Sequence, residues 1–182
     1  DVNQNTSTCA ATGNNNGCRT NPAYGNNKQY SPLADSQYDG LDVSFTQRPA
    51  SWGMLRVSYT YSKALDDVGE FFFSGPVDNF DIWKDWGRSD DDQRQRLVLD
   101  GTVYSSVGPA STRWRHLSHD WQLSGTVEAY SALPFNVVTG ANTVQGTTAR
   151  PMLGGAMIGR NTGTGCGTLS VDARLTRVFA LE

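Results

Sequence analysis

The 182-residue sequence has a small supply of apolar residues. Hydrophobic residues make up 37% of the chain, whereas a soluble globular domain usually has roughly 45–50%. Glycine is plentiful, with 19 residues, and Asn, Ser and Thr are frequent. This composition disfavours a packed helical domain and favours strands joined by long polar loops. The expected fold class is therefore all-β.

Long hydrophobic runs are also missing. No stretch approaches the roughly 18 apolar residues that a membrane helix needs. This excludes a helical crossing but not a β-barrel, whose strands are short segments of alternating polarity. The sequence begins Asp1-Val2-Asn3-Gln4, without an initiator Met or a basic and apolar leader, so any signal peptide is expected to lie outside it.

Neither charge nor catalytic motifs point to a nucleic-acid partner or an enzyme. The chain has 15 Lys and Arg against 18 Asp and Glu, for a net charge of -3, and no basic cluster is interleaved with aromatic residues. The sequence has no Ser/His/Asp order, paired acids, glycine-rich phosphate loop or H-E-x-x-H motif. We therefore expect no enzyme, no cofactor and no nucleic acid, and we assign no catalytic residue.

Cysteine and histidine are scarce, which disfavours a metal site. Of three cysteines, Cys9 and Cys18 flank a Gly- and Asn-rich stretch, so they either close a loop disulfide in an oxidising compartment or stay unpaired. Cys166 is expected to be unpaired or to have its partner outside the sequence. His116 and His119 have a His-x-x-His spacing, but they fall in a predicted short turn, so we favour the turn over a metal site.

Five stretches alternate between apolar and polar residues with a period of two, which predicts strands with one apolar face. In the first of them, Leu41, Val43 and Phe45 alternate with polar residues. The five predicted strands span residues 37–47, 54–63, 96–105, 121–131 and 168–178. Strands of roughly 9–11 residues suit a tilted membrane crossing, whereas strands in globular proteins are usually nearer 5–6 residues.

Two architectures fit this alternation. In a soluble β-sandwich the polar face meets solvent, whereas in a membrane barrel the apolar face meets lipid and the polar face meets a hydrated lumen. Aromatic residues gather near the predicted strand ends, as they do in an interfacial girdle. Short turns alternate with long connections, as in outer-membrane barrels. These features favour an antiparallel transmembrane β-barrel segment.

Three long connections, at residues 1–36, 64–94 and 139–167, are predicted to be loops. The loop at 64–94 is rich in aromatic residues, and Phe72, Trp83 and Trp86 are candidates for binding an organic substrate or a sugar. The alternative, which we favour, is that the loop packs its own apolar residues. The run Asp90 to Asp92 either binds a cation or forms an ion-pair cluster that anchors the loop, and we favour the ion pairs.

Several segments resemble one family when taken in order. The chain is similar to the Oar-like TonB-dependent receptors of the outer membrane. The matching segments are Asn21-Pro22-Ala23-Tyr24-Gly25, Ser36-Gln37-Tyr38-Asp39-Gly40-Leu41-Asp42-Val43-Ser44, Val57-Ser58-Tyr59-Thr60-Tyr61-Ser62-Lys63-Ala64-Leu65-Asp66-Asp67, Gly87-Arg88-Ser89-Asp90-Asp91-Asp92-Gln93-Arg94-Gln95-Arg96-Leu97-Val98, Trp121-Gln122-Leu123-Ser124-Gly125, Leu133-Pro134-Phe135, and Gly159-Arg160-Asn161 leading to Leu169-Ser170-Val171-Asp172.

The resemblance implies a barrel of about 22 strands in the outer membrane of a Gram-negative bacterium. Residues 1–36 would be an extracellular loop and residues 37–182 a partial barrel wall. The implied partners are outer-membrane lipid, an unknown substrate, and the TonB energy-transducing complex, which acts through a plug domain not present in this chain. Five or six strands cannot close a barrel alone. The rival hypotheses are a secreted carbohydrate-binding β-sandwich and a self-assembling surface or filament β protein.

Overall fold

The structure is a computed structural model that describes residues 2–9, 16–69, 75–105, 119–143 and 145–179. The chain divides into two compact units. The sheet unit comprises residues 40–62, 93–132 and 166–182, and the loop unit comprises residues 1–39, 63–92 and 133–165. The described residues contain no helix that is both long enough and apolar enough to cross a membrane.

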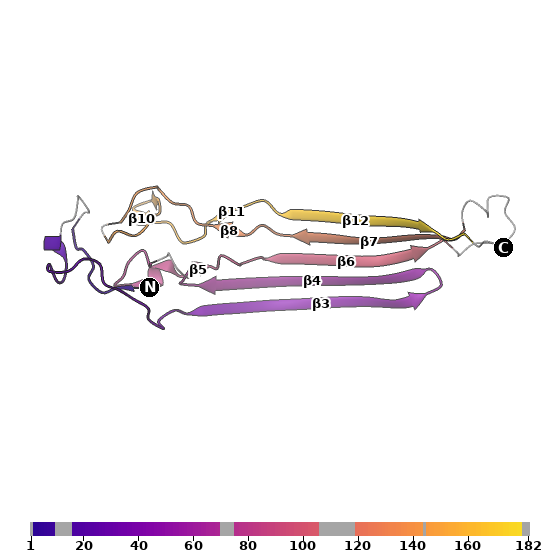
Figure 1. Ribbon diagram of the computed structural model, residues 1–182, viewed down its shortest axis with the longest axis horizontal. Coiled ribbons are helices and arrows are strands. Elements are labelled where there is room, and N and C mark those ends of the chain that lie inside the picture. Colours follow the sequence, from indigo (N-terminus) through magenta and orange to yellow (C-terminus); the bar gives the residue numbers. More distant parts are fainter. Residues whose placement is uncertain (1, 10–15, 70–74, 106–118, 144, 180–182) are drawn as a thin grey trace. The chain divides into compact units, whose positions relative to one another are not determined.

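Five long strands make up the sheet. They are β3 (Ser36–Ala50), β4 (Gly53–Asp66), β6 (Gln95–Tyr104), β7 (Trp121–Tyr130) and β12 (Thr168–Arg177). Their order is β12-β7-β6-β4-β3 (Figure 1). The pairs β4-β6, β6-β7 and β7-β12 are antiparallel, and a two-residue connection makes β3 and β4 a hairpin. The expected all-β antiparallel class is therefore correct.

Two strands extend further than the sequence pattern predicts. β3 continues through Arg48-Pro49-Ala50, beyond the end of the strand predicted at 37–47. Proline is accepted there because β3 lies at the edge of the described sheet, where a missing N–H need not break a ladder bond. β4 continues to Asp66 because β5 (Gly87–Arg88) pairs with its last two residues. The 64–94 stretch therefore contains strand residues at 64–66 and 87–88 instead of being loop throughout.

The strand register places like residues beside like. Val57, Leu99, Val127 and Val171 form one row across four strands. One position along, Arg56, Asp100, Thr126 and Asp172 form the neighbouring row. Because adjacent residues of a strand point to opposite faces, one face of the sheet is apolar and the other is polar. A slip of one residue in any strand would exchange the two faces.

The apolar face of the sheet unit is uncovered. Leu169 is 70% exposed, Val171 63% and Phe45 56%. Among the described residues of this unit, the five long strands form a single layer, with no second sheet on either face. This is the opposite of a β-sandwich, in which the two apolar faces bury each other.

The loop unit contains only short described elements. Three two-stranded pairs are β1 (Val2–Asn3) with β2 (Lys28–Gln29), β8 (Pro134–Phe135) with β11 (Gly163–Thr164), and β9 (Met152–Leu153) with β10 (Ala156–Met157). Two 3-10 turns, η1 (Asn16–Cys18) and η2 (Ile82–Asp85), and the strand β5, which pairs with the end of β4, are the other described elements of this unit. The predicted loops 1–36 and 139–167 thus contain paired segments of two residues. Cys9 and Cys18 form a disulfide with an S–S distance of 2.00 Å.

The buried residues of the loop unit are mostly polar. Val77 is the one buried hydrophobic residue among those described. The buried polar and charged residues of this unit are Asn5, Thr6, Asp67, Asp85, Asp92, Arg150, Arg160 and Asn161. Hydrogen bonds and ion pairs, more than apolar burial, therefore give this unit its specific structure.

Candidate functional site

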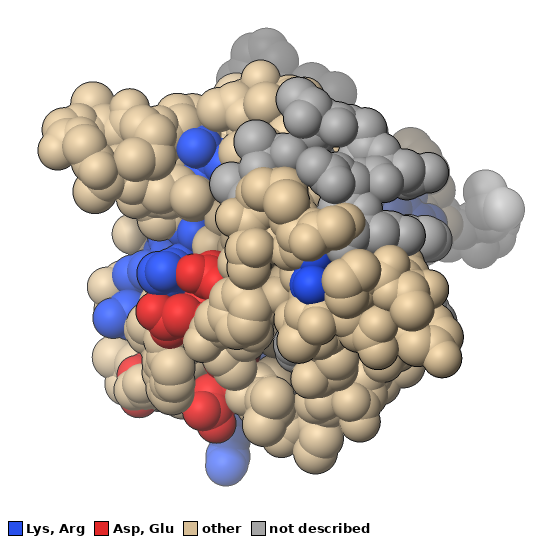
Figure 2. All heavy atoms as spheres, turned by 90° about the vertical axis from the view of Figure 1, so that its left-hand side faces the viewer, with Lys and Arg blue, Asp and Glu red and all other residues tan. Residues whose placement is uncertain are grey.

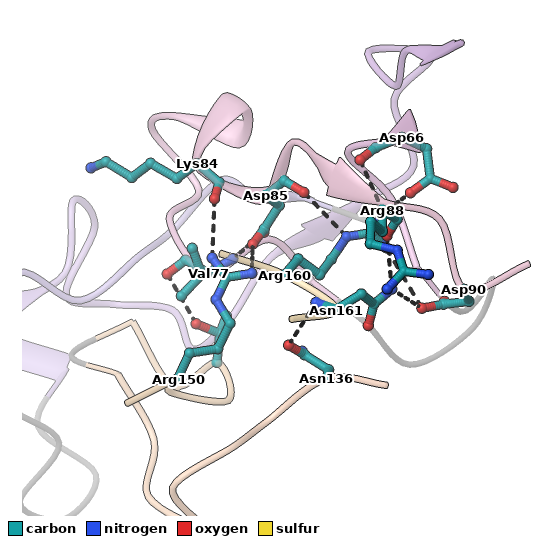
Figure 3. A network of polar contacts seen from close by, with 11 residues as sticks. Asp66, Val77, Lys84, Asp85, Arg88, Asp90, Asn136, Arg150, Arg160 and Asn161 are labelled. Carbon is teal, nitrogen blue, oxygen red and sulfur yellow. Dashed lines mark hydrogen bonds and ion pairs between the residues drawn. The ribbon is translucent and has the colours of Figure 1, made fainter. Parts of the chain in front are cut away.

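Arg160 lies at the centre of a buried polar network in the loop unit (Figure 3). It is 7% exposed and pairs with the Asp66 carboxylate. Its Nη2 also donates to the Asp66 carbonyl at 2.9 Å, and its Nε donates to the Asp85 carbonyl at 3.1 Å. Burial lowers the pKa of the Arg160 guanidinium. One side chain thus joins the end of β4 to the 3-10 turn η2.

Arg150 makes a second contact with the same turn. Its Nη1 lies 2.7 Å from Asp85 Oδ1, and its Nη2 donates to the Lys84 carbonyl at 3.0 Å. The other carboxylate oxygen of Asp85 accepts the Val77 N–H at 2.6 Å. Asp85 is 6% exposed, so its charge is compensated by a partner that is itself buried, as a buried carboxylate requires.

Asn161 follows Arg160 and adopts a left-handed backbone conformation, with φ of 55°. Its Nδ2 donates to the Arg88 carbonyl at 2.9 Å and to Asp90 Oδ1 at 2.6 Å. Asparagine tolerates this conformation better than most residues because its short polar side chain can hydrogen-bond locally. Through these two hydrogen bonds, Asn161 connects the loop after β10 to β5 and the segment that follows it.

The acidic run Asp90 to Asp92 takes part in the same network. Asp92 is 1% exposed; its Oδ2 lies 2.7 Å from Arg88 Nε and its Oδ1 accepts the Ala64 N–H at 2.8 Å. Asp91 is exposed. The run thus supplies an ion pair that holds β5 beside the end of β4. The described residues contain no group of three His, Cys, Asp or Glu placed to hold a metal ion.

A second, more exposed cluster surrounds Asp78. Lys84 Nζ lies 2.6 Å from Asp78 Oδ2, and Gln145 Nε2 donates to Asp78 Oδ1 at 2.8 Å. The Lys84 hydrogen bond is the main cause that holds the pKa of Asp78 below its usual value, with smaller contributions from Gln145 and the Phe80 N–H, against an opposing effect of burial. The same pair raises the pKa of Lys84.

A cleft of about 610 Å³ opens beside the buried network, and all its lining residues belong to the loop unit. Its volume falls in the range of small-molecule sites, about 300–1,000 Å³. The lining has three basic residues and three acidic residues, so its formal charge is balanced: Lys28, Arg150, Arg160, Asp67, Asp85 and Asp90. Figure 2 shows acidic and basic atoms side by side in one region of a mostly uncharged face.

Four buried polar atoms of residues that line this cleft have no hydrogen-bond partner among the described residues. They are Asp67 Oδ2, Asn161 Oδ1, Arg150 Nε and Arg160 Nη1. Their residues are 3%, 0%, 5% and 7% exposed. The orientation of the Asn161 amide is fixed, because its Nδ2 already donates to two oxygens. An unpaired buried polar group costs about 1–3 kcal/mol, so these atoms lower the stability of the described part of the loop unit unless they find a partner outside it.

The aromatic residues proposed from the sequence lie elsewhere. Trp83 belongs to η2 and Trp86 caps it; their ring centroids are 5.5 Å apart at a tilt of 47°. Neither ring lines the cleft. Phe72 and His116 lie outside the described residues. The assignment of Phe72, Trp83 and Trp86 to substrate binding stays a prediction.

Sequence reasoning did not identify the residues that form the cleft wall. Asp67, Arg160 and Asn161 were named only within segments of the family resemblance, and Arg150 was given no role. The sequence does contain one local signal, the run Gly159-Arg160-Asn161. Asparagine in a loop often occupies a left-handed backbone position. The partners of these side chains lie far away in the sequence, so spacing does not reveal them.

The fold and the site define a class of protein. A single layer of long antiparallel strands, with apolar rows exposed on one face and charged rows on the other, is the arrangement of a membrane β-barrel wall. The chain matches the model of the outer membrane beta barrel domain family over residues 1–181 and belongs to that family. Its location is accordingly the outer membrane. Neither a curated protein nor a solved structure matches the chain.

Proposed function

We propose that this chain forms part of the wall of a TonB-dependent receptor of the Oar-like type, which moves a substrate across the outer membrane of a Gram-negative bacterium. The observation that carries the proposal is the register of the sheet, in which Val57, Leu99, Val127 and Val171 share one row and charged residues fill the next. Such a sheet suits hydrocarbon on one side and a wet lumen on the other.

The exposed apolar face is costly in water and favourable in lipid. Each Å² of apolar surface moved out of water contributes about 25 cal/mol, and large residues of β3 and β12 are more than half exposed. An exposed apolar patch of this kind marks a contact with a membrane or another protein. The long strands, from 10 to 15 residues, are sufficient for a tilted crossing.

The edges of the sheet support a larger closed wall. β3 and β12 each have one strand neighbour among the described residues, and unpaired strand edges are not tolerated in lipid. Further strands must therefore pair with both edges in a membrane. Closure by other strands of the same receptor accounts for both edges, and it fits the order of segments that resembles the Oar-like receptors.

Self-assembly into a surface or filament protein is the alternative that the open edges favour. A filament would pair β3 of one copy with β12 of the next, but it would leave the apolar face in water unless lipid or another layer covered it. A carbohydrate-binding sandwich fits less well, since the sheet unit is a single layer among the described residues. No catalytic step forms part of the proposal.

Two measurements on the full-length gene product test the proposal. Cell fractionation should place the protein in the outer membrane, with a compact form that unfolds only on heating in detergent. The purified protein should bind the periplasmic domain of TonB, and binding should be lost when the plug region is deleted. A folded outer-membrane protein that never binds TonB would overturn the receptor proposal, and edge-to-edge polymers would favour the filament.

A further inference from the structure

Arg177 lies on the apolar face of the sheet, at the last position of β12. It is the register partner of Trp121, the first residue of β7. Two residues earlier along β12, Leu175 pairs with Leu123. Because side chains alternate along a strand, Arg177 and Trp121 share the face of these two leucines. A cation therefore stands where the apolar surface ends, about 7 Å along the strand from the Leu123–Leu175 row.

Two aromatic rings contact the guanidinium group of Arg177. Its Cζ lies 5.3 Å from the centroid of the Trp121 ring and 4.8 Å from that of Phe179, and both distances are within the roughly 6 Å of a cation–π contact. Phe179 is 69% exposed and Arg177 is half-buried. The two contacts thus fix the position of the charge at the surface of the sheet unit, at the edge of its apolar face.

The strand register places Arg177 at the end of the sheet that has the short connection. The two-residue connection between β3 and β4 lies at this end (Figure 1), because one register row joins Gly53, Val103, Leu123 and Leu175. In outer-membrane barrels the short connections face the periplasm, and aromatic girdles flank the apolar band at both membrane interfaces. Arg177 and Trp121 are therefore expected at the headgroup level of the periplasmic leaflet.

We propose that Arg177 binds the phosphate group of a glycerophospholipid in the surrounding membrane. The binding site consists of the Arg177 guanidinium group, the Trp121 and Phe179 rings that hold it, and the adjoining leucine row. The proposal goes beyond the proposed function, because it depends on the location of the chain in the outer membrane and not on TonB or on a transported substrate.

The chemistry of the guanidinium group favours a phosphate. Arginine keeps its charge in proteins, and its planar fork of N–H donors matches a pair of phosphate oxygens. Arg177 Nε is buried, so the two Nη groups are the donors that a headgroup would contact. The acyl chains would then extend over Leu123 and Leu175, which are 50% and 62% exposed. The charge and the apolar row thus fit one amphipathic ligand.

A free phosphate ion fits this position less well than a phospholipid. The ion would have to be captured from solution, and a single ion pair near a protein surface holds it weakly. A phospholipid of the surrounding membrane already presents its phosphate at the level of Arg177, at a high effective concentration. The exposed leucines beside the charge would contribute nothing to the binding of an ion. These observations favour the lipid.

The test uses the full-length protein, purified in non-ionic detergent, and two photoreactive lipids that differ only in the headgroup. One is phosphatidylglycerol with a diazirine near the headgroup end of an acyl chain, and the other is the diacylglycerol with the same chains. Each lipid is titrated and crosslinked by light, and mass spectrometry quantifies the label on peptides that contain Leu123 or Leu175. Phosphatidylglycerol should label them at an about tenfold lower concentration than diacylglycerol. Equal labelling by the two lipids would overturn the proposal.

Variants assign the phosphate contact to one side chain. Arg177→Gln should raise the midpoint of phosphatidylglycerol labelling about tenfold, equivalent to about 1.4 kcal/mol, and leave labelling by diacylglycerol unchanged. Arg174→Gln is the matched control, because Arg174 lies on the same strand but on the polar face, opposite Ser124, and it should label like wild type. A folded Arg177→Gln variant that labels like wild type, or an equal loss in Arg174→Gln, would refute the site. If Arg177→Gln does not fold, the comparison of the two lipids on wild type still decides.

Inorganic phosphate distinguishes the lipid from the free ion. An excess of phosphate should leave labelling by phosphatidylglycerol the same as an excess of chloride at equal ionic strength does. If phosphate displaces the lipid and chloride does not, the position is a site for a free anion and the lipid proposal is wrong.

Discussion

The two units of this protein are held together by different kinds of contact. In the sheet unit, backbone ladders join the strands while apolar side chains such as Leu169 and Phe45 are left exposed. In the loop unit, the buried residues are mostly charged or amide-bearing, and Arg160 and Asp92 are almost fully enclosed. The exposed apolar side chains of the sheet unit fit the lipid that surrounds an outer-membrane barrel.

The same difference changes what holds each unit together. A sheet in lipid gains stability from its environment, since every outward apolar group contributes without needing a partner in the chain. A buried ion pair in the loop unit depends on one particular partner. It contributes little net stability, but loss of either partner leaves an uncompensated buried charge. We therefore expect the loop unit to be sensitive to single polar changes and the sheet unit to changes on one face.

The largest effect is expected from Arg160→Ala. This variant leaves Asp66 and Asp90 without their guanidinium partner, and breaking a buried pair costs about 3–5 kcal/mol. Hydrogen exchange should therefore detect local opening of residues 133–165 while the folded barrel persists in detergent. Arg56→Ala is the control, because the Arg56–Asp100 pair is 3.9 Å long and exposed, and such pairs contribute at most about 1 kcal/mol. Equal effects would contradict the comparison.

A charge on the apolar face should have the next largest effect. Val127→Arg introduces a guanidinium into the central row of the sheet, which costs about 2–4 kcal/mol at the middle of a bilayer. The urea concentration needed to unfold the full-length protein from lipid vesicles should fall accordingly. Thr126→Arg, one residue away on the polar face between Asp100 and Asp172, should be tolerated. If the two variants unfold alike, this face does not meet lipid.

A moderate effect is expected at the turn between β3 and β4. Gly53 has φ of 148°, and an added Cβ would stand 2.1 Å from the Thr102 carbonyl oxygen. Gly53→Ala should cost about 1–3 kcal/mol through backbone strain, measured by urea unfolding in vesicles. Gly25→Ala in the loop unit is the matched control, because no atom lies within 4 Å of its added Cβ. A Gly53→Ala variant as stable as wild type would show that the β6 backbone at Thr102 can shift to make room for the methyl group at little energetic cost.

The smallest effect is the pH dependence of the Asp78–Lys84 pair. The Lys84 hydrogen bond lowers the pKa of Asp78 from its usual 3.8, so the stability this carboxylate contributes is complete above that value and is lost as pH falls through the lower, folded pKa. Hydrogen exchange around η2, followed from about pH 5 to about pH 2, should reveal this loss. Asp78→Asn should remove this pH dependence of hydrogen exchange. If the variant still opens as the pH falls, another titrating group causes the opening.

Much of the sheet could be predicted because its signal is local. Alternation of Leu41, Val43 and Phe45 with polar neighbours identifies a strand without knowledge of its partners. The extension of β4 to Asp66 was missed because it depends on pairing with β5, which lies more than 20 residues later in the chain. β5 is too short to show a polar and apolar alternation of its own.

The site was less predictable for the same reason. Aromatic residues in a loop are natural candidates because large rings often bind ligands, but Trp83 and Trp86 contact each other and neither lines the cleft. Arg160 reaches Asp66 across 94 positions. No spacing rule connects residues so far apart, since an arginine in a loop is most often a solvated one.

By itself, the sequence determined which residues form strands and which face of each strand is apolar, because side-chain direction alternates along any extended chain. The tertiary structure decided which distant charges meet. That result depends on loop closure, in which Arg150, Arg160 and Asn161 return to residues 64–92 and are removed from water together. Once buried, these side chains need hydrogen-bond or ion-pair partners. A local sequence pattern does not show which distant residues those partners are.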